Sequence, residues 1–399
     1  MKIGLSTSVI QRGQTGIARY VLSLSRAILD SGADIELVLF VLHDDLPLFS
    51  FAKNRATIVP VPERFRPPIN DILWHQFVLP GLARRHRLDI LHVPSYRRMV
   101  CSSPCPSIAT IHDLAPFHVK GKYDWKRTFY GRVAARYLAR CQSRIIAISQ
   151  YTARDIQRFF DVPADRITVI YNGIDHKRFH PPDDVKRVRQ LVAERYGINE
   201  SFFLYVARLE HPGKNHLRLI EGFTQFKAAT GSRWKLVLAG SDWHGAETIH
   251  AAVEKSPYRA DIHHLGFVAD FDLPALYGAA GAFVYPSLFE GFGLPPVEAM
   301  ACACPVVSST RGSLAEVVDD AALTIDPDNT PEIAGALSRI AADPAEQDRL
   351  RVAGLARAQQ FTWSACAAET IQAYAAICRS RAGATITTVA EPAKSEFFS

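Results

Sequence analysis

The stretch that decides the fold runs from Ala282 to Met300 and reads AFVYPSLFEGFGLPPVEAM. Its first four residues are typical of a short buried strand, and a helix is expected from Leu294, because proline suits the first helical turn. Gly291 and Gly293 let the backbone approach a ligand, and the free N–H groups of the helix would point at it. On spacing alone, the carboxylates of Glu290 and Glu298 are explained equally well as ligand contacts or as solvated side chains.

Strands alternate with helices along the rest of the chain. Apolar runs predict strands at 2–5, 35–41, 89–93, 107–111, 144–148, 167–171, 202–206, 235–239, 262–265, 282–285, 305–308 and 322–325. Amphipathic patterns predict helices at 16–30, 71–86, 126–141, 150–160, 215–229, 272–280, 294–302, 313–318, 330–341 and 344–359. Such alternation predicts an α/β protein with parallel sheets covered on both faces.

The length of 399 residues is too great for one hydrophobic core and predicts two domains. The polar stretch HPPDDVK at 180–186 contains a double proline, which ends helices and strands, so we place the boundary there. The expected domains are 1–180 and 181–360, each Rossmann-like and doubly wound. Because ligands bind beyond the carboxyl ends of parallel strands, two such domains are expected to face a central cleft. The small, polar residues 381–399 are expected to be disordered.

Composition points to a globular protein, with 48% hydrophobic and 22% charged residues. A continuous apolar run long enough to cross a membrane is lacking, and the first residues do not form a signal peptide, so a cytoplasmic location is expected. The seven cysteines lack paired metal-ligand spacing and are expected to be reduced thiols. The net charge is +6, with the basic residues concentrated in the first half. That half would attract an anionic partner or surface.

Three more loops follow predicted strands. In ARLEHPGKN, Arg208 and Lys214 precede a predicted helix and could hold a diphosphate, or they could be exposed loop cations. In GQTGIARY, Gly16 belongs to a glycine-containing turn without dinucleotide-binding spacing. In TIHDLAPF, His112 ends a strand and could act on a reacting hydroxyl, or it could be a structural histidine.

Taken together, these motifs resemble glycosyltransferase family 4, the retaining group 1 type of nucleotide-sugar transferase with the GT-B fold. The matching stretches are FEGFGLPPVEAMACACPVV with the family's E-x7-E pattern, ARLEHPGKN, GQTGIARY, TIHDLAPF, IIAISQYTARDI and VIYNGIDHKRF. They occur in the expected order and span residues 1 to about 378. One departure is the separation of Gly13 from Gly16, which are not adjacent here. The resemblance also implies that the last helix, 361–378, crosses back to the first domain.

The resemblance implies a role for each candidate residue. Arg208 and Lys214 would neutralise the donor diphosphate, and Glu290 would contact the donor sugar. His112 would lie near the transferred sugar and the acceptor, and Glu298 would hold the ribose hydroxyls. The remaining donor contacts would be Gly16 at the phosphates, Val268 at the base, and the amides of Gly291, Phe292, Gly293 and Leu294 at sugar and phosphate.

The donor is expected to be GDP-mannose, because TGIARY and IHDLAP look most like mannosyltransferases, with a UDP-sugar as the alternative. The acceptor would be a glycan or a polyprenyl-diphosphate-linked glycan of a surface polysaccharide. A nucleotide-sugar epimerase or a non-catalytic subunit of the same fold is the remaining alternative. No cofactor or metal is expected: Asp270 and Asp272 could suggest a metal, but capping of the next helix explains them more simply.

Residues 120–144 combine eight Lys and Arg residues with interleaved aromatics. Arg132, Arg136, Arg140 and Arg144 recur every four positions, as one stripe of a helix. Such a helix is typical of a peripheral membrane contact, here on the inner face of the cytoplasmic membrane, although a solvated face explains it as well. No nucleic-acid-binding motif occurs, so nucleic acid is not an expected partner.

Overall fold

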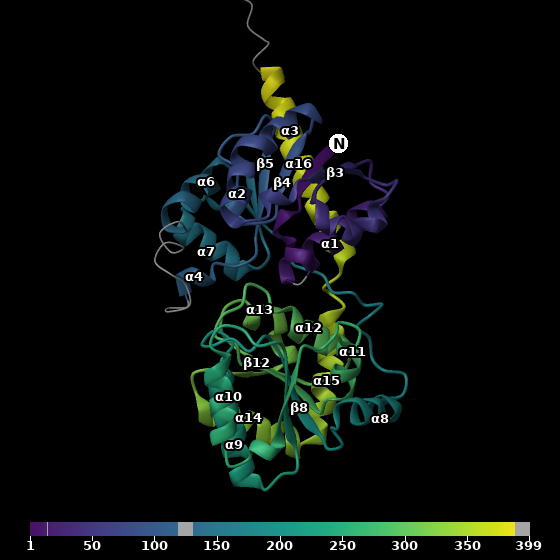
Figure 1. The fold of residues 1–399 in the computed structure, drawn as a ribbon, viewed down its shortest axis with the longest axis vertical. Helices are drawn as coiled ribbons and strands as arrows, with labels where there is room; N and C mark the ends of the chain where they lie inside the picture. The colour runs from purple at the N-terminus through teal and green to yellow at the C-terminus, as the bar shows by residue number, and fades with distance from the viewer. Residues whose placement is uncertain (14, 119–130, 388–399) are drawn as a thin grey trace, which may run out of the picture.

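The computed structural model describes residues 1–13, 15–118 and 131–387. Two α/β lobes, each built on a parallel sheet, lie one above the other along the long axis (Figure 1). The α/β class and the pair of Rossmann-like sheets predicted from the sequence are confirmed.

The first sheet has the strand order β3-β2-β1-β4-β5-β6-β7. Its strands are β1 (Lys2–Ser6), β2 (Glu36–Leu42), β3 (Thr57–Val61), β4 (Ile90–Val93), β5 (Ser107–Ile111), β6 (Arg144–Ala147) and β7 (Ile167–Val169). The main helices around it are α1 (Gly16–Asp30), α2 (Pro68–Leu73), α3 (Leu79–Arg85), α4 (Ala115–His118), α6 (Arg136–Cys141) and α7 (Gln150–Phe160).

The second sheet has the order β10-β9-β8-β11-β12-β13. Its strands are β8 (Phe202–Val206), β9 (Lys235–Ala239), β10 (Ile262–Gly266), β11 (Ala282–Tyr285), β12 (Val306–Ser309) and β13 (Leu323–Ile325). Its helices are α8 (Val185–Tyr196), α9 (His216–Thr230), α10 (Ala246–Lys255), α11 (Leu273–Ala279), α12 (Leu294–Ala301), α13 (Leu314–Val318), α14 (Thr330–Ala342) and α15 (Pro344–Ala358).

The strand order reverses once in each sheet, between β1 and β4 and between β8 and β11. In open parallel sheets a crevice forms at this reversal, beyond the carboxyl ends of the strands. The loops after β1, β8 and β11 carry Gly16, Lys214 and Glu290, so the topology brings these distant parts of the chain to one region.

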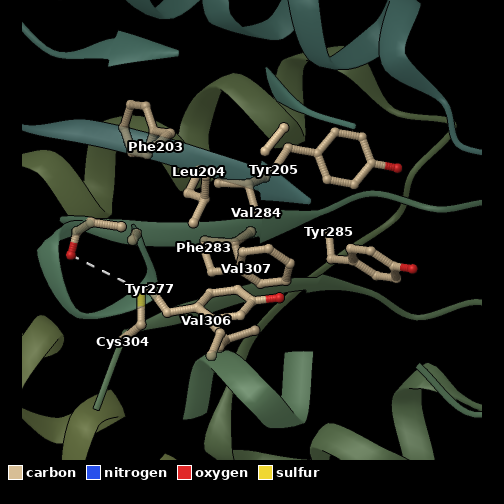
Figure 2. Close-up of a cluster of buried hydrophobic side chains, with 14 of the residues drawn as sticks. Phe203, Leu204, Tyr205, Tyr277, Phe283, Val284, Tyr285, Cys304, Val306 and Val307 are labelled. Carbon is tan, nitrogen blue, oxygen red and sulfur yellow. Dashed lines mark hydrogen bonds between the residues drawn. The ribbon is translucent and has the colours of Figure 1, made fainter. Parts of the chain in front are cut away.

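The second lobe's core supports this region from beneath. Phe203, Leu204, Phe283 and Val307 are fully buried where β8, β11 and β12 meet (Figure 2). Tyr205, Tyr277 and Tyr285 are buried in the same cluster, and their hydroxyls point to one side of it (Figure 2). Buried tyrosine hydroxyls need partners, and each of these finds one at the site.

The final helix, α16 (Trp363–Thr387), leaves the second lobe and runs into the first (Figure 1). Cys366, Ala367 and Tyr374 lie in the same buried cluster as Ile3 and Leu24 of the first lobe. The helix continues to residue 387, so the expected disorder of 381–399 is wrong for 381–387, and 388–399 lie outside the described residues.

Several elements differ from the sequence predictions. Strand β3 was missed because Pro60 cannot donate to a ladder, and the strand is tolerated at the sheet edge. Helix α8 was missed because Val192 is its one buried residue and its periodicity is weak. α10 was also missed.

The predicted helix 71–86 is three pieces, since a π-helical turn, η4 (Trp74–Val78), precedes Pro80. In the predicted helix 126–141, residues 126–130 lie outside the description, and a π turn, η6 (Gly131–Ala135), precedes α6.

Candidate active site

The loop from β11 to α12 approaches the first lobe closely. A Cβ atom at Gly291 would lie 1.7 Å from the carbonyl oxygen of His112, so only a glycine allows this contact. Thr152 Oγ1 donates to the Gly291 carbonyl at 3.4 Å. Gly293 has φ +94° and occupies the N-cap of α12. The strand, glycine turn and helix predicted from the sequence therefore form, with Leu294 as the first helical residue.

Phe292 lies within this turn, but its side chain belongs to the core. It is 3% exposed, and its ring lies 5.4 Å from that of Phe361 and 6.1 Å from that of Tyr171. Any contribution of Phe292 to a ligand would therefore come from its backbone. The side chain anchors the turn on which Glu290 stands.

Glu290 and Lys214, both predicted site residues, are in direct contact. Lys214 Nζ donates to Glu290 Oε1 at 2.5 Å, and the same oxygen accepts from Ser287 Oγ at 2.7 Å and Tyr285 OH at 2.9 Å. Burial opposes ionisation of Glu290, but Lys214 and the two hydroxyls outweigh it and lower the pKa of this carboxyl. The site therefore holds a carboxylate and an ammonium group side by side.

Both lobes line a cavity of about 440 Å³, although neither Lys214 nor Glu290 is among its lining residues. Gln11 and Thr15 contribute from the first lobe, and Arg208, Trp243 and Val268 from the second. The Arg208 guanidinium lies over the Trp243 ring, 4.6 Å from its centroid, which holds the cation at the wall. Arg208 and Val268, both predicted from the sequence, thus share a cavity large enough for part of a nucleotide.

Glu298 is buried, with 2% of its side chain exposed. It accepts hydrogen bonds from Arg19 Nη1, which comes from the first lobe, and from Tyr277 OH at 3.2 Å. Burial raises the pKa of Glu298, and the positive charges of Arg19 and Arg178 offset part of that effect. Arg19 Nη2 also lies 3.3 Å from Asp270, so this arginine of the first lobe pairs with two carboxylates of the second.

His112 and Gly16 come from the first lobe. Burial lowers the pKa of His112 to about 4, only partly opposed by a hydrogen bond to the Pro94 carbonyl, so the ring is neutral near pH 7. Its Nε2 is buried without a hydrogen-bond partner among the described residues, and Tyr20 packs edge-on at 4.7 Å. Gly16 begins α1, and a Cβ atom there would meet open space. Thr15, just before it, caps the helix and lines the cavity.

Sequence reasoning missed Arg19, Tyr277, Tyr285 and Ser287. Arg19 lies in the first turn of α1, where a cation opposes the helix dipole, so a carboxylate partner could have been suspected. Tyr285 ends its strand, and a tyrosine at that position presents its hydroxyl to the loop beyond.

The explanation of the acidic triplet as helix capping is wrong. Asp272 occupies the N-cap of α11, but its side chain caps no backbone N–H. Its Oδ2 instead lies 2.9 Å from Arg195 and accepts from Tyr196 OH at 3.0 Å. Asp270 pairs with Arg19 and with Arg178, whose Nη1 lies 3.2 Å away. Both acids are thus used in ion pairs with cations distant in the chain.

Among the described residues, one group has the chemistry of a metal site: Asp242, His250 and His264. His250 Nε2 lies 3.0 Å from Asp242 Oδ1, and His264 Nε2 lies 3.0 Å from the Gly240 carbonyl. These atoms already have partners, and two of the three residues are exposed, so internal pairing accounts for the group. The expectation that no metal is used stays a prediction.

The predicted basic stripe is partly outside the described residues, which leave out 119–130. In the described part, Arg136 and Arg140 both pair with Asp161, at 3.0 Å for Arg136. Arg144 donates to Thr168 Oγ1 at 2.9 Å. None of the helices in the described ranges is long and apolar enough to cross a membrane.

Comparisons with known proteins agree with this geometry. The model for Glycosyltransferase Family 4 matches residues 14–178, and that for Glycosyl transferases group 1 matches 190–357. O-antigen chain mannosyltransferase B of Escherichia coli is 29% identical, over 94% of this chain and 99% of its own. MMP alpha-(1->4)-mannosyltransferase of Mycolicibacterium hassiacum is 30% identical, over 73% of this chain and 71% of its own.

Among solved structures, sucrose-phosphate synthase from Thermosynechococcus elongatus has a TM-score of 0.76 at 21% identity, covering 95% of this chain and 100% of that one. At this identity the likeness concerns the fold, and it identifies the two facing lobes as GT-B. The motifs predicted from the sequence and the two family matches complete the assignment. The chain is a glycosyltransferase enzyme and belongs to glycosyltransferase family 4, of the group 1 type.

Proposed function

We propose that the protein transfers mannose from GDP-mannose to a hydroxyl of a glycan or a polyprenyl-diphosphate-linked glycan, with retention of the anomeric configuration. Two of its relatives support this proposal, since one is an O-antigen chain mannosyltransferase and another is an alpha-(1->4)-mannosyltransferase. The product would be a surface polysaccharide.

The observation that carries the proposal is the Lys214–Glu290 contact at the start of α12. Cleavage of a sugar–phosphate bond develops negative charge on the diphosphate and positive charge on the sugar ring. Preorganised cations and helix N–H groups stabilise the first, and a carboxylate favours the second. Lys214 and Arg208, the backbone at 291–294 and Gly16 would serve the diphosphate, while Glu290 would face the sugar.

The other residues divide the remaining donor contacts. Glu298 would bind the ribose hydroxyls, and Val268 would pack on the base inside the cavity. His112 would act as a neutral hydrogen-bonding group toward the transferred sugar or the acceptor, which fits an Nε2 that has no partner within the described ranges of the chain. The acceptor hydroxyl would attack from the face that the nucleotide leaves, and we assign no protein nucleophile.

We propose that this chemistry needs no metal, because arginine, lysine and a helix N-terminus can supply the positive charge. Transfer should then proceed unchanged in EDTA. A location at the inner face of the cytoplasmic membrane, with contact through residues 120–144, also remains a proposal.

The test begins with thermal stabilisation by GDP, UDP, ADP and their sugars. A ligand at a hundred times its dissociation constant adds about 2.7 kcal/mol to the free energy of unfolding, which shifts the melting point clearly. We expect the largest shift with GDP and GDP-mannose, lost in Lys214→Ala and kept in Lys186→Ala, an exposed lysine on α8.

A shift with UDP or UDP-sugars alone would show that the donor is a UDP-sugar, and the proposed sugar transfer would stand. Transfer is then followed as nucleotide release from the sugar donor that gives the largest shift. Release only when a glycan acceptor is present supports a transferase. Conversion of the donor to an epimer without an acceptor, or binding without turnover, would overturn the proposal.

A further inference from the structure

Helix α2 and the π turn η4 expose apolar side chains on their outer side. Ile69 is 72% exposed, Leu73 47%, Phe77 76% and Val78 38%, and we call these four the apolar stripe. The first three recur every four residues and so lie along one side of the helix. A surface helix normally turns such a side inward, so this one presents its apolar stripe to a partner.

The inner side of the same helix is held by buried side chains and hydrogen bonds, so the helix has one defined orientation. Trp74 and His75 are fully buried, and His75 Nε2 lies 2.9 Å from Ser6 Oγ at the carboxyl end of β1. Asp71, 3% exposed, accepts from Arg98 at 2.5 Å. With these three residues facing inward, the apolar stripe has to face outward.

A second element adds to this surface. Gln76 donates to the Met99 carbonyl at 2.8 Å and accepts from the Cys101 N–H at 3.0 Å. Cys101 Sγ lies 3.8 Å from the hydroxyl of Tyr137, which is 61% exposed on α6. Val133, in the π turn just before α6, is 55% exposed. The two helices thus meet at the 99–101 loop, on the same side of the first lobe (Figure 1).

The charge beside the stripe is positive. Arg84, Arg85 and Arg87 are exposed at the end of α3, the continuation of the same helix. From 67 to 88 the one carboxylate is that of Asp71, which is buried and paired. Asp89, just beyond, is exposed and accepts from the Lys2 backbone N–H at 2.7 Å, so the three arginines leave an excess of positive charge. An apolar strip with this excess beside it complements the interface of an anionic bilayer.

We propose that the apolar stripe inserts into the headgroup boundary of an anionic lipid bilayer, with Arg84 and Arg85 on the lipid phosphates. This surface is distinct from the 120–144 segment and does not depend on the identity of the donor. It lies at the first lobe, whose β1 end borders the cleft.

The experiment is co-sedimentation of the full chain with vesicles of phosphatidylcholine, with and without phosphatidylglycerol. We expect binding to the anionic vesicles that weakens with salt. The triple variant Ile69→Gln/Leu73→Gln/Phe77→Gln should bind at least about tenfold more weakly, because the stripe no longer gains from leaving water. Arg84→Gln and Arg85→Gln should each weaken binding about fivefold at low salt.

The matched control is Leu191→Gln/Val352→Gln, which removes exposed apolar side chains from the second lobe, 50% and 71% exposed. It should bind vesicles like the wild type. Melting temperature and nucleotide-induced stabilisation of the triple variant should be unchanged, which separates lipid binding from the donor site.

Two results would overturn the proposal. One is no binding of the wild type to anionic vesicles, or equal binding by the triple variant. The other is a lower melting temperature or a smaller oligomer for the triple variant, which would show that the stripe is covered by another part of the chain or by a second copy.

Discussion

Replacing Arg19 with alanine tests whether the lobes close over the site as described. The Arg19 side chain is 31% exposed, whereas Glu298 is 2% exposed. Hydrogen bonds to charged groups contribute about 1.5–3 kcal/mol, and removing one partner of a fully buried pair costs about 3–5 kcal/mol. Because Arg19 is partly solvated and Tyr277 still donates to Glu298, we expect Arg19→Ala to lower the free energy of unfolding by about 2 kcal/mol.

The assay is urea unfolding of the wild type, Arg19→Ala, Glu298→Gln and the double variant at pH 7. If the two side chains interact, the losses should not add, and the coupling energy should be about 1.5 kcal/mol or more. Losses that add, with Arg19→Ala costing under about 0.5 kcal/mol, would refute the reasoning, because that is the range of an uninvolved surface residue.

The pH dependence gives a second reading of the same pair. Burial raises the pKa of Glu298 in the folded protein, so the folded state binds the proton more tightly than the unfolded state. The resulting stability is greatest below the usual glutamate pKa and is lost as the pH rises through the raised value. Without Arg19 the pKa should rise further, so the deficit of Arg19→Ala should be larger at pH 8 than at pH 5.

Further predictions concern His112, Gly291 and the last helix. Since burial holds the pKa of His112 at about 4, kcat/KM should show no titration near pH 6.5, and a limb there that vanishes in His112→Asn would contradict this. The same depressed pKa means that stability due to His112 is lost as the pH falls from 6.5 toward 4, which acid titration of the two proteins can compare. Gly291→Ala should hold the lobes apart and lower kcat by about 100-fold or more, with a larger radius of gyration in solution; normal activity would refute the contact. Truncation before Phe361 removes Tyr374 from the core of the first lobe and should lower the melting temperature by several degrees, so unchanged melting would count against it.

Much of the fold could be predicted from the sequence because its signals are local. The strand, glycine turn and helix around Glu290 depend on neighbours within a few residues, and each piece formed as expected. The same holds for Lys214, whose loop follows a clear strand. Once two parallel sheets are inferred, the topology itself brings such loops together at the strand ends.

The missed features depend on contacts between distant residues. Arg19 and Glu298 are 279 residues apart, so no local pattern could join them. The helix at 71–86 was recognised as amphipathic, but periodicity does not say which side faces inward. The orientation is set by two hydrogen bonds to residues distant in the sequence, between His75 and Ser6 and between Arg98 and Asp71.

The two carboxylates of the E-x7-E segment share one property that bears on how a donor would enter. Glu298 is buried and Glu290 is mostly buried, with 16% of its side chain exposed, and each is held by a cation, Glu290 by Lys214 and Glu298 by Arg19. A buried charge needs such a partner, because an unpaired one would be neutralised or would destabilise the fold. On the proposed function, the donor's diphosphate would take the place of Glu290 at Lys214, while Glu290 keeps the hydrogen bonds from Ser287 and Tyr285 and gains the hydroxyls of the sugar. The ribose hydroxyls would donate to Glu298 in place of Arg19, which keeps Asp270 as a partner. A nucleotide lacking either the diphosphate or the ribose hydroxyls could complete only one of the two exchanges.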